Sequence, residues 1–194
     1  MELLEILVHG KSTVCKIITQ ISNAKIIDAD EIAKSLDFLG SEYVNKISKL
    51  FGQDVLNDRG SLNRKKLGDF IYTNLPNKLA LDKITFQYVG SEFEKRLEVL
   101  RSEKLDFIVL DVPLLFESEL NKLCDFVISV IANTELKIKR IQTRDNIAET
   151  IARQRLSIQK DDNFFSQNSD FVIENNGDKE LIKKSLERIL NNIK

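Results

Sequence analysis

The chain has 194 residues, 42% of them hydrophobic, so it is long enough to bury one sizeable core. Its 29 lysine and arginine residues balance 30 aspartate and glutamate residues, which excludes a global electrostatic attraction to nucleic acid or to an anionic membrane. The two cysteines are far apart and form neither a CxxC pair nor a disulfide framework, which fits a reducing compartment. Because no apolar run reaches the roughly 20 residues of a membrane span, we expect a soluble, cytoplasmic protein.

Segments typical of strands and of helices alternate along most of the chain. Apolar runs rich in β-branched or aromatic residues predict buried strands at residues 3–8, 25–30, 105–116, 124–132 and 169–176. Apolar residues at spacings of three and four predict helices at residues 11–21, 31–50, 78–100, 134–144 and 179–193. This alternation is typical of an α/β fold with a mostly parallel sheet, in which ligands bind beyond the carboxyl ends of the strands.

Half of a phosphate-binding motif lies at the first junction between a strand and a helix. Gly10, Lys11 and Ser12 match the end of the pattern GxxxxGK[ST], whose backbone N–H groups and lysine hold phosphates and whose hydroxyl binds Mg²⁺. Glu5 stands where the pattern has its first glycine, and bulky residues follow it. Only ten residues precede Lys11, so a small deletion within the loop explains the departure as well as substitution does. The alternative is a strand end followed by a helix that Ser12 or Thr13 caps.

Two aspartates close the next predicted strand. Asp28 and Asp30 are two residues apart, and extended backbone would place both carboxylates on one face at the strand end, where ligands bind. A carboxylate in that place can accept the proton of an attacking hydroxyl or orient metal-bound water. The alternative is that Asp30 caps the helix that begins at Glu31.

The alternation breaks between about residues 35 and 102, where no run predicts a buried strand. Helical patterns in this interval are separated by polar segments at residues 57–63 and 73–78. We interpret the interval as a helical insertion between two strands. Such an insertion could hold a second substrate.

Two later strands are followed by further candidate site residues. The strand that ends at Asp111 resembles a Walker B element, in which the acid supports the metal; the alternative is a buried strand followed by a turn. The segment ENNGD, residues 174–178, follows the last predicted strand. It is either a loop against an adenine ring or a turn in which Asp178 caps the last helix.

Arginines are dense in only one region of the sequence, which contains Arg140, Arg144, Arg153 and Arg155. Arg140 and Arg144 are four residues apart and share a helix face. The planar fork of donors on arginine suits phosphate, so the group is compatible with a lid that closes over a phosphoryl group. It is also compatible with a solvated helix face.

Taken in order, six segments resemble those of the dephospho-coenzyme A kinase family: GKST, IIDADEIA, FGQDVLNDRGSLNRKKLG, LDVPLLFESELNKLCD, TRDN and SDFVIENNGD. The resemblance implies a P-loop kinase-like, three-layer α/β fold for residues 1–194, with a helical substrate-binding insertion at residues 35–102 and a lid at residues 140–165. It implies that ATP with Mg²⁺ phosphorylates the ribose 3′-hydroxyl of dephospho-coenzyme A, the final step of coenzyme A biosynthesis. Neither nucleic acid nor a membrane is an expected partner.

The resemblance also implies roles for individual residues. Lys11 would hold the β- and γ-phosphates, Asp30 would act as the base, and Arg144 would stabilise charge on the transferring group. Ser12 would ligate Mg²⁺. The residues implied to bind the nucleotide are Val8, His9, Gly10, Lys11, Ser12, Thr13 and Asn175, the last of them near the adenine. Asp111, Arg140 and Arg155 are further candidates.

The chain departs from the family pattern in two places besides the phosphate loop. Phe86 and Gln87 stand where the family usually has a His-Pro pair, and Asn63 replaces a commonly acidic residue. Two alternatives to the kinase therefore stay open. One is a degenerate relative that binds a nucleotide or coenzyme A without catalysis, and the other is a different small-molecule or nucleotide kinase of the same fold.

Overall fold

The structure is a computed structural model, and it describes residues 2–7, 11–72, 74–112 and 115–193. The chain divides into two compact units. Residues 1–27 and 100–194 form what we call the core unit, and residues 28–99 form the helical unit.

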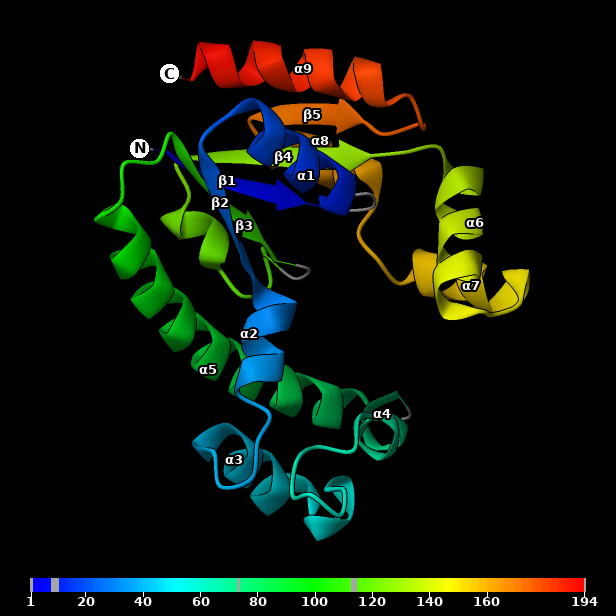
Figure 1. The fold of residues 1–194 in the computed structure, drawn as a ribbon. Helices are drawn as coiled ribbons and strands as arrows, with labels where there is room; N and C mark the ends of the chain where they lie inside the picture. The colour runs from blue at the N-terminus through cyan, green and yellow to red at the C-terminus, as the bar shows by residue number, and fades with distance from the viewer. Residues whose placement is uncertain (1, 8–10, 73, 113–114, 194) are drawn as a thin grey trace. The chain divides into compact units, whose positions relative to one another are not determined.

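A five-stranded sheet organises the core unit (Figure 1), and its strand order is β2-β3-β1-β4-β5. The strands are β1 (Glu2–Leu7), β2 (Ala24–Asp28), β3 (Phe107–Asp111), β4 (Phe126–Ile131) and β5 (Phe171–Glu174). The pairings of β1 with β3, of β1 with β4 and of β4 with β5 are parallel. The predicted parallel α/β fold is therefore confirmed, and all five strands overlap predicted ones.

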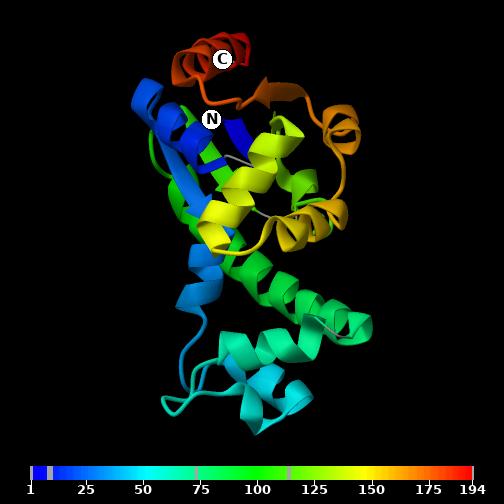
Figure 2. The same cartoon turned by 90° about the vertical axis from the view of Figure 1, so that its right-hand side faces the viewer.

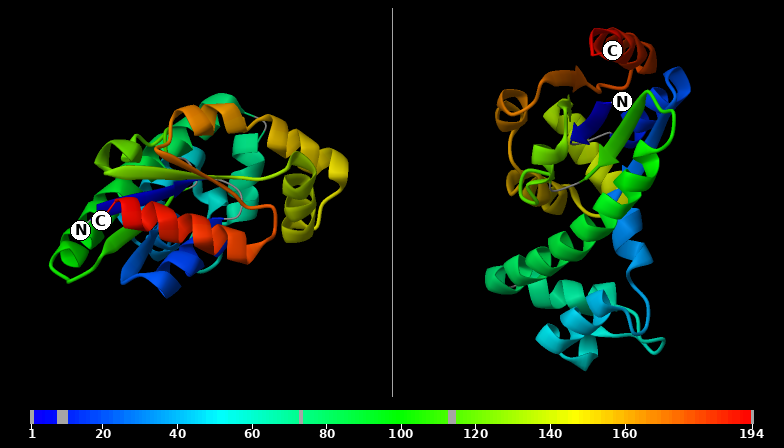
Figure 3. Two further views of the ribbon diagram at one scale, coloured as in Figure 1. Left: turned by 90° about the horizontal axis from the view of Figure 1, so that it is seen from above. Right: turned by 90° about the vertical axis from the view of Figure 1, so that its left-hand side faces the viewer.

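Two helices cover one face of this sheet. They are α1 (Lys11–Ile21) and α9 (Lys179–Asn192), and Figure 3 shows α9 running along the sheet. The helix α9 buries an apolar stripe that consists of Ile182, Leu186, Ile189 and Leu190. It packs in one cluster with Phe107 and Val109 of β3, whose side chains share a face because strand residues alternate between faces.

Three helices lie between β4 and β5 in the sequence of the core unit: α6 (Thr134–Asp145), α7 (Glu149–Ser157) and α8 (Asp162–Gln167). The turn between α6 and α7 contains Asn146 with a φ of 51°, a left-handed conformation that asparagine tolerates better than most residues. Ile138, Ile141 and Ala152 form a small apolar cluster that joins the two helices, which lie side by side in Figure 2. This pair overlaps the predicted lid region, residues 140–165, and carries the arginine group.

The helical unit contains α2 (Ala29–Ser35), α3 (Glu42–Phe51), the short helix η1 (Gln53–Val55), α4 (Arg64–Tyr72) and most of α5 (Leu75–Arg101). Its own apolar core includes Tyr43, Val44, Ile47, Leu62 and Ile84. Among its described residues the structure has no strand, only an isolated bridge between Leu56 and Leu62. The predicted absence of a buried strand between residues 35 and 102 thus holds for the described part of that interval.

The long helix α5 passes without a break through Phe86 and Gln87, where the family usually has His-Pro. A proline at position 87 would remove a backbone hydrogen bond and kink the helix. With glutamine there, α5 continues for 27 residues and buries Ile84, Val89 and Phe93 along its length. Neither α5 nor any other helix in the described ranges is long and apolar enough to cross a bilayer.

The prediction of a single helix over residues 31–50 is wrong. The chain leaves the helix after α2, and Gly40 adopts a φ of 84°, which a residue with a side chain rarely does. Ser41 then begins α3 as its N-cap, because its hydroxyl accepts the Val44 N–H at 3.1 Å. The helix α4 corresponds to the helical pattern expected between the polar segments at residues 57–63 and 73–78, whereas α7 and α8 have no counterpart among the predicted elements.

The stripe of α9 gives a direct test of this core. We expect Leu186→Ala to lower the free energy of unfolding by about 2–5 kcal/mol, because Leu186 is fully buried and its truncation leaves a cavity. Leu181→Ala is the matched control on the same helix, since its side chain is 61% exposed, and it should change stability by no more than about 0.5 kcal/mol. Urea unfolding measures both, and equal losses would contradict the packing described.

Candidate active site

Lys11 and Asp111 meet in the core unit. The Lys11 Nζ lies 2.7 Å from Asp111 Oδ1, and each side chain is only 17% exposed. Lys11 is the first residue of α1, and Asp111 is the last of β3. The Cys15 thiol, one helical turn after Lys11, lies 3.9 Å from the other carboxylate oxygen. Because both charges are largely withdrawn from water, the loss of either would leave its partner poorly compensated.

Glu5, which stands at the place of the missing glycine, belongs to β1 rather than to a loop. It pairs with Leu110 on one side and with Val127 on the other, and the strand continues to Leu7. Residues 8–10 alone connect β1 to α1. Three of the predicted nucleotide-binding residues, Val8, His9 and Gly10, lie outside the described residues.

Ser12 and Thr13 are described and lie in the first turn of α1. The Ser12 side chain is exposed, so its hydroxyl is available to a ligand. Over the described ranges, no group of three or more histidine, cysteine or acidic residues could hold a metal ion. The Ser12 hydroxyl still suits Mg²⁺, because this ion commonly takes one or two protein ligands and completes its shell with phosphate oxygens and water.

The loop after β5 is tied to the arginine group. Arg140 Nη2 donates to Asn175 Oδ1 at 3.0 Å, and the Asn175 N–H donates to the Ile131 carbonyl at 2.8 Å. Asn175 is buried, with 3% exposure. The Arg140 Nη1 is also buried, and no described residue hydrogen-bonds to it. A buried guanidinium nitrogen without a partner is costly, so this end of Arg140 is suited to a ligand.

An open cavity of about 240 Å³ lies beside Asn175, at the carboxyl ends of β4 and β5. Its lining residues are Ile131, Ala132, Asn133, Glu174 and Asn176. The Asn176 side chain fixes this edge, because its Oδ1 accepts the Asn133 N–H at 2.9 Å and its Nδ2 donates to Glu174 Oε2 at 3.2 Å. Glu174 and Asn176 were not predicted as individual site residues, although both belong to the ENNGD segment.

Arg144 and Arg155 converge on a carboxylate that the sequence analysis missed. Arg144 binds Asp145 through two hydrogen bonds of 2.6 and 2.9 Å, and Arg155 Nη1 donates to the same residue at 2.6 Å. The hydrogen bonds from Arg144 lower the pKa of the Asp145 carboxyl, and the charge of Arg155 adds to the effect. The Asp145 carboxylate therefore stays ionised at pH values lower than those at which an ordinary aspartate takes up a proton. Its ion pairs with Arg144 and Arg155 are present at neutral pH.

Arg153 lies apart from that pair. It binds Glu135 and Glu149 in an exposed network, so the structure accounts for it as part of a solvated helix face. Arg144 itself remains 71% exposed. The dense arginine group of the sequence is thus three separate arrangements, around Asn175, Asp145 and the two glutamates.

In the helical unit, the expectation that Asp28 and Asp30 project from one face of a strand is wrong. The strand β2 ends at Asp28, and Asp30 lies in the first turn of α2. Asp28 Oδ1 caps this helix by accepting the N–H groups of Asp30 at 2.7 Å and of Glu31 at 3.2 Å. The cap is therefore Asp28 and not Asp30. The Asp30 side chain is exposed, and no described residue hydrogen-bonds to its carboxylate.

Solved structures with the same fold support the architecture. The chain resembles a dephospho-CoA kinase from Campylobacter jejuni with a TM-score of 0.71 and 27% identity, covering 98% of this chain and 96% of the other. It also resembles TT1252 from Thermus thermophilus with a TM-score of 0.82 and 20% identity, covering 100% and 98%, a likeness that concerns the fold alone. These matches confirm the P-loop kinase fold.

Relatives in sequence agree with this assignment. The dephospho-CoA kinase of Bacillus thuringiensis subsp. konkukian is 37% identical over 181 residues, which cover 93% of this chain and 90% of the relative. That of Carboxydothermus hydrogenoformans is 34% identical over 181 residues, which cover 93% and 87%. A family model described as dephospho-CoA kinase matches residues 7–180. The chain therefore belongs to the dephospho-CoA kinase family.

Proposed function

We propose that this chain transfers the γ-phosphoryl group of ATP to the ribose 3′-hydroxyl of dephospho-coenzyme A, giving coenzyme A and ADP. The observation that carries the proposal is the family match over residues 7–180, which includes the Lys11–Asp111 pair at the start of α1. Phosphoryl transfer requires mainly positioning and electrostatic stabilisation. In the candidate site, different residues are proposed to bind the triphosphate, to accept the hydroxyl proton and to hold the rest of the nucleotide.

The start of α1 is the proposed binding site for the triphosphate. Lys11 would exchange its contact with Asp111 for the β- and γ-phosphates, and the amino end of an 11-residue helix favours the same anion. The Ser12 hydroxyl would ligate Mg²⁺, and Asp111 would support the metal as an outer partner. When bound, the metal neutralises charge that develops on the phosphate oxygens.

Asp30 is the proposed general base. Its carboxylate is exposed, and the capping task that competes for it is carried by Asp28. A carboxylate in this state can accept the proton of the ribose hydroxyl as that oxygen attacks the γ-phosphorus. The hydroxyl oxygen forms the new P–O bond while the bond to ADP breaks.

Residues beyond β4 and β5 are proposed to hold the rest of the nucleotide. The cavity beside Asn175 suits a purine base, and the Arg140 Nη1, to which no described residue hydrogen-bonds, suits an acceptor atom of the base or of a phosphate. Because the Asn175 side chain binds Arg140, we propose that Asn175 positions this arginine and the adenine loop. Arg144, which Asp145 orients, would stabilise charge on the transferring phosphoryl group.

One observation favours a second candidate function, binding without catalysis. Because β1 runs through Leu7, residues 8–10 leave fewer backbone N–H groups to cradle phosphates than the full motif provides. A protein with this defect could still bind a nucleotide or coenzyme A. Only turnover separates the two candidates.

We expect ADP release that depends on acceptor when the purified protein is given Mg-ATP and dephospho-coenzyme A in a coupled assay. Reactions without the acceptor, or with other nucleosides and small alcohols, should stay near background. If the folded protein binds dephospho-coenzyme A in calorimetry but releases no ADP, the chain is a binding relative. Faster turnover with another acceptor would identify a different kinase.

Lys11→Ala should lower this turnover by about 100-fold or more, because the variant loses a charge that stabilises the transferring phosphate. Lys16→Ala is the matched control, since Lys16 is an exposed lysine on the same helix, and its rate should stay at the wild-type level. Rates at saturating substrates test the pair. An unimpaired Lys11→Ala enzyme would exclude Lys11 from phosphate binding.

Asp30→Asn should lower kcat by about 100-fold or more while leaving the KM for ATP close to its wild-type value, because the amide cannot accept the hydroxyl proton. Glu31→Gln removes the neighbouring exposed carboxylate from the same helical turn and should leave kcat unchanged. Steady-state kinetics with each substrate varied in turn distinguishes them. Equal effects of the two substitutions would argue for a general charge effect and against a base at Asp30.

A further inference from the structure

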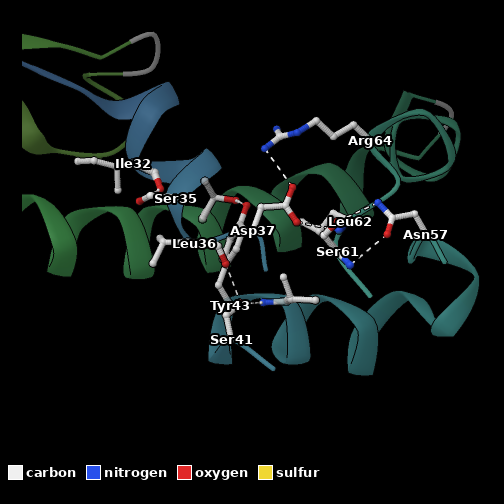
Figure 4. A network of polar contacts seen from close by, with 12 residues as sticks. Ile32, Ser35, Leu36, Asp37, Ser41, Tyr43, Asn57, Ser61, Leu62 and Arg64 are labelled. Atoms are coloured by element: carbon white, nitrogen blue, oxygen red, sulfur yellow. Dashed lines mark hydrogen bonds and ion pairs between the residues drawn. The ribbon is translucent and has the colours of Figure 1, made fainter. Parts of the chain in front are cut away.

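Asp37 anchors two separate segments of the helical unit (Figure 4). It follows the end of α2, and its side chain is only 12% exposed. Oδ1 accepts the Leu62 N–H at 2.7 Å, and Oδ2 accepts a hydrogen bond from Arg64 Nη2 at 3.4 Å. Asp37 therefore fixes both the backbone that leads into α4 and the guanidinium at the start of that helix.

Most of the Arg64 guanidinium remains available. The side chain is 59% exposed, and among the described residues Asp37 is its one hydrogen-bonding partner. The remaining N–H groups of its planar fork can bind the oxygens of a carboxylate or a phosphate. Burial raises the pKa of the nearby Tyr43 hydroxyl, and this effect is opposed by the Thr85 hydroxyl at 3.3 Å and by the charge of Arg64.

The segment that presents Arg64 is held in a defined conformation. The Asn57 side chain accepts the N–H groups of Arg59 and Ser61, and Leu56 bridges to Leu62. A β-carbon at Gly60, where φ is 74°, would clash with the Leu39 side chain, so the loop lies directly against the segment that contains Asp37. A guanidinium on such a support loses little freedom when it binds a ligand.

The contact between Arg64 and Asp37 adds little to folding stability. An exposed ion pair at 3.4 Å contributes little. Arg64 is also followed by Lys65 and Lys66, and the first turn of α4 has no acidic residue, although a helix start disfavours positive charge. The Leu62 hydrogen bond explains Asp37 but not the positive charge of Arg64 at this helix start, and a local electrostatic conflict of this kind points to a functional use of that charge.

We propose that Arg64 binds the diphosphate group of dephospho-coenzyme A and that Asp37 is the positioning residue that aims it. This inference rests on the proposed kinase function, and it assigns the acceptor's anionic group to the helical unit. A diphosphate presents several oxygens in the geometry that an arginine fork matches. The sequence analysis assigned no role to either residue.

The position of Asp37 relative to the proposed base supports the assignment. Asp30 lies in the first turn of α2, and Asp37 follows the end of the same helix. Seven residues of helix correspond to about 10 Å along the axis, which is the scale of one nucleotide. The helix α2 can therefore position the proposed base, Asp30, and also Asp37, which orients the Arg64 guanidinium toward the diphosphate.

The test measures the affinity for the acceptor separately from that for ATP. Arg64→Ala should raise the KM for dephospho-coenzyme A, and its Kd in calorimetry without ATP, by about tenfold to a hundredfold, as expected for the loss of charge-assisted hydrogen bonds. The KM for ATP should stay close to wild type. Arg59→Ala is the control, because it removes the same charge from an exposed side chain in the preceding loop.

An unchanged Kd in Arg64→Ala, or an equal change in Arg59→Ala, would overturn the inference. If the wild-type protein binds dephospho-coenzyme A but releases no ADP, the kinase function fails, and the two Kd values still decide the role of Arg64. If the wild-type protein does not bind dephospho-coenzyme A, both proposals are wrong.

Asp37→Asn tests the positioning role. Asparagine keeps a side-chain oxygen for the Leu62 N–H but cannot accept from Arg64 with its second group. We expect the KM for dephospho-coenzyme A to rise while kcat, the KM for ATP and the melting temperature stay near wild type. The control is Asp58→Asn, which neutralises an exposed acid of the same unit. A lowered melting temperature with a rise in both KM values would mean a purely structural role, and an unchanged KM for the acceptor would exclude the positioning role.

Discussion

Parallel pairing of β1 with β3 and with β4 is the constraint on which the proposed nucleotide site depends. Parallel strands have their carboxyl ends at one edge of the sheet, so segments far apart in the sequence meet there. This geometry lets Lys11 reach Asp111 across 100 positions of sequence. It also places the loop after β5 against the end of β4, where Asn175 hydrogen-bonds to Ile131. Apolar side chains of β3, β4 and β5 are buried in one cluster with α1 and α9.

Four aspartates have distinct roles in the proposed site: one caps a helix, one is the proposed base and two bind arginines. Asp28 caps α2 and so leaves the Asp30 carboxylate without a structural task. Asp37 and Asp145 each hold arginines whose other donors stay exposed. An arginine held by a carboxylate is already ordered before a phosphate arrives, so binding costs less conformational entropy. The same device thus occurs in both units, once beside the proposed acceptor and once in the arginine-bearing helices.

The buried strands and the long amphipathic helices could be predicted from the sequence because apolar periodicity is a local property. The spacing predicts α1 with the bounds that the structure has, and it fails over residues 31–50, where Gly40 and Ser41 break the pattern. The motifs predicted Lys11 and Asp111 as site residues. Spacing could not reveal the partners of Arg64 and Arg155, since these ion pairs join residues 27 and 10 positions apart through irregular loops. Spacing also could not show that Asp28 is the helix cap and that Asp30 is not, because these roles depend on the residue at which β2 ends and α2 begins.

Lys11, Asp30 and Arg144 are proposed to direct the γ-phosphoryl group of ATP to the ribose 3′-hydroxyl of dephospho-coenzyme A. The most direct measurement is ³¹P NMR of the product formed from Mg-ATP and dephospho-coenzyme A, combined with its mass. The account predicts a single new phosphomonoester on the ribose 3′-oxygen, formed in step with ADP. Release of inorganic phosphate and ADP without a new ester, or an ester at another position of the acceptor, would contradict it.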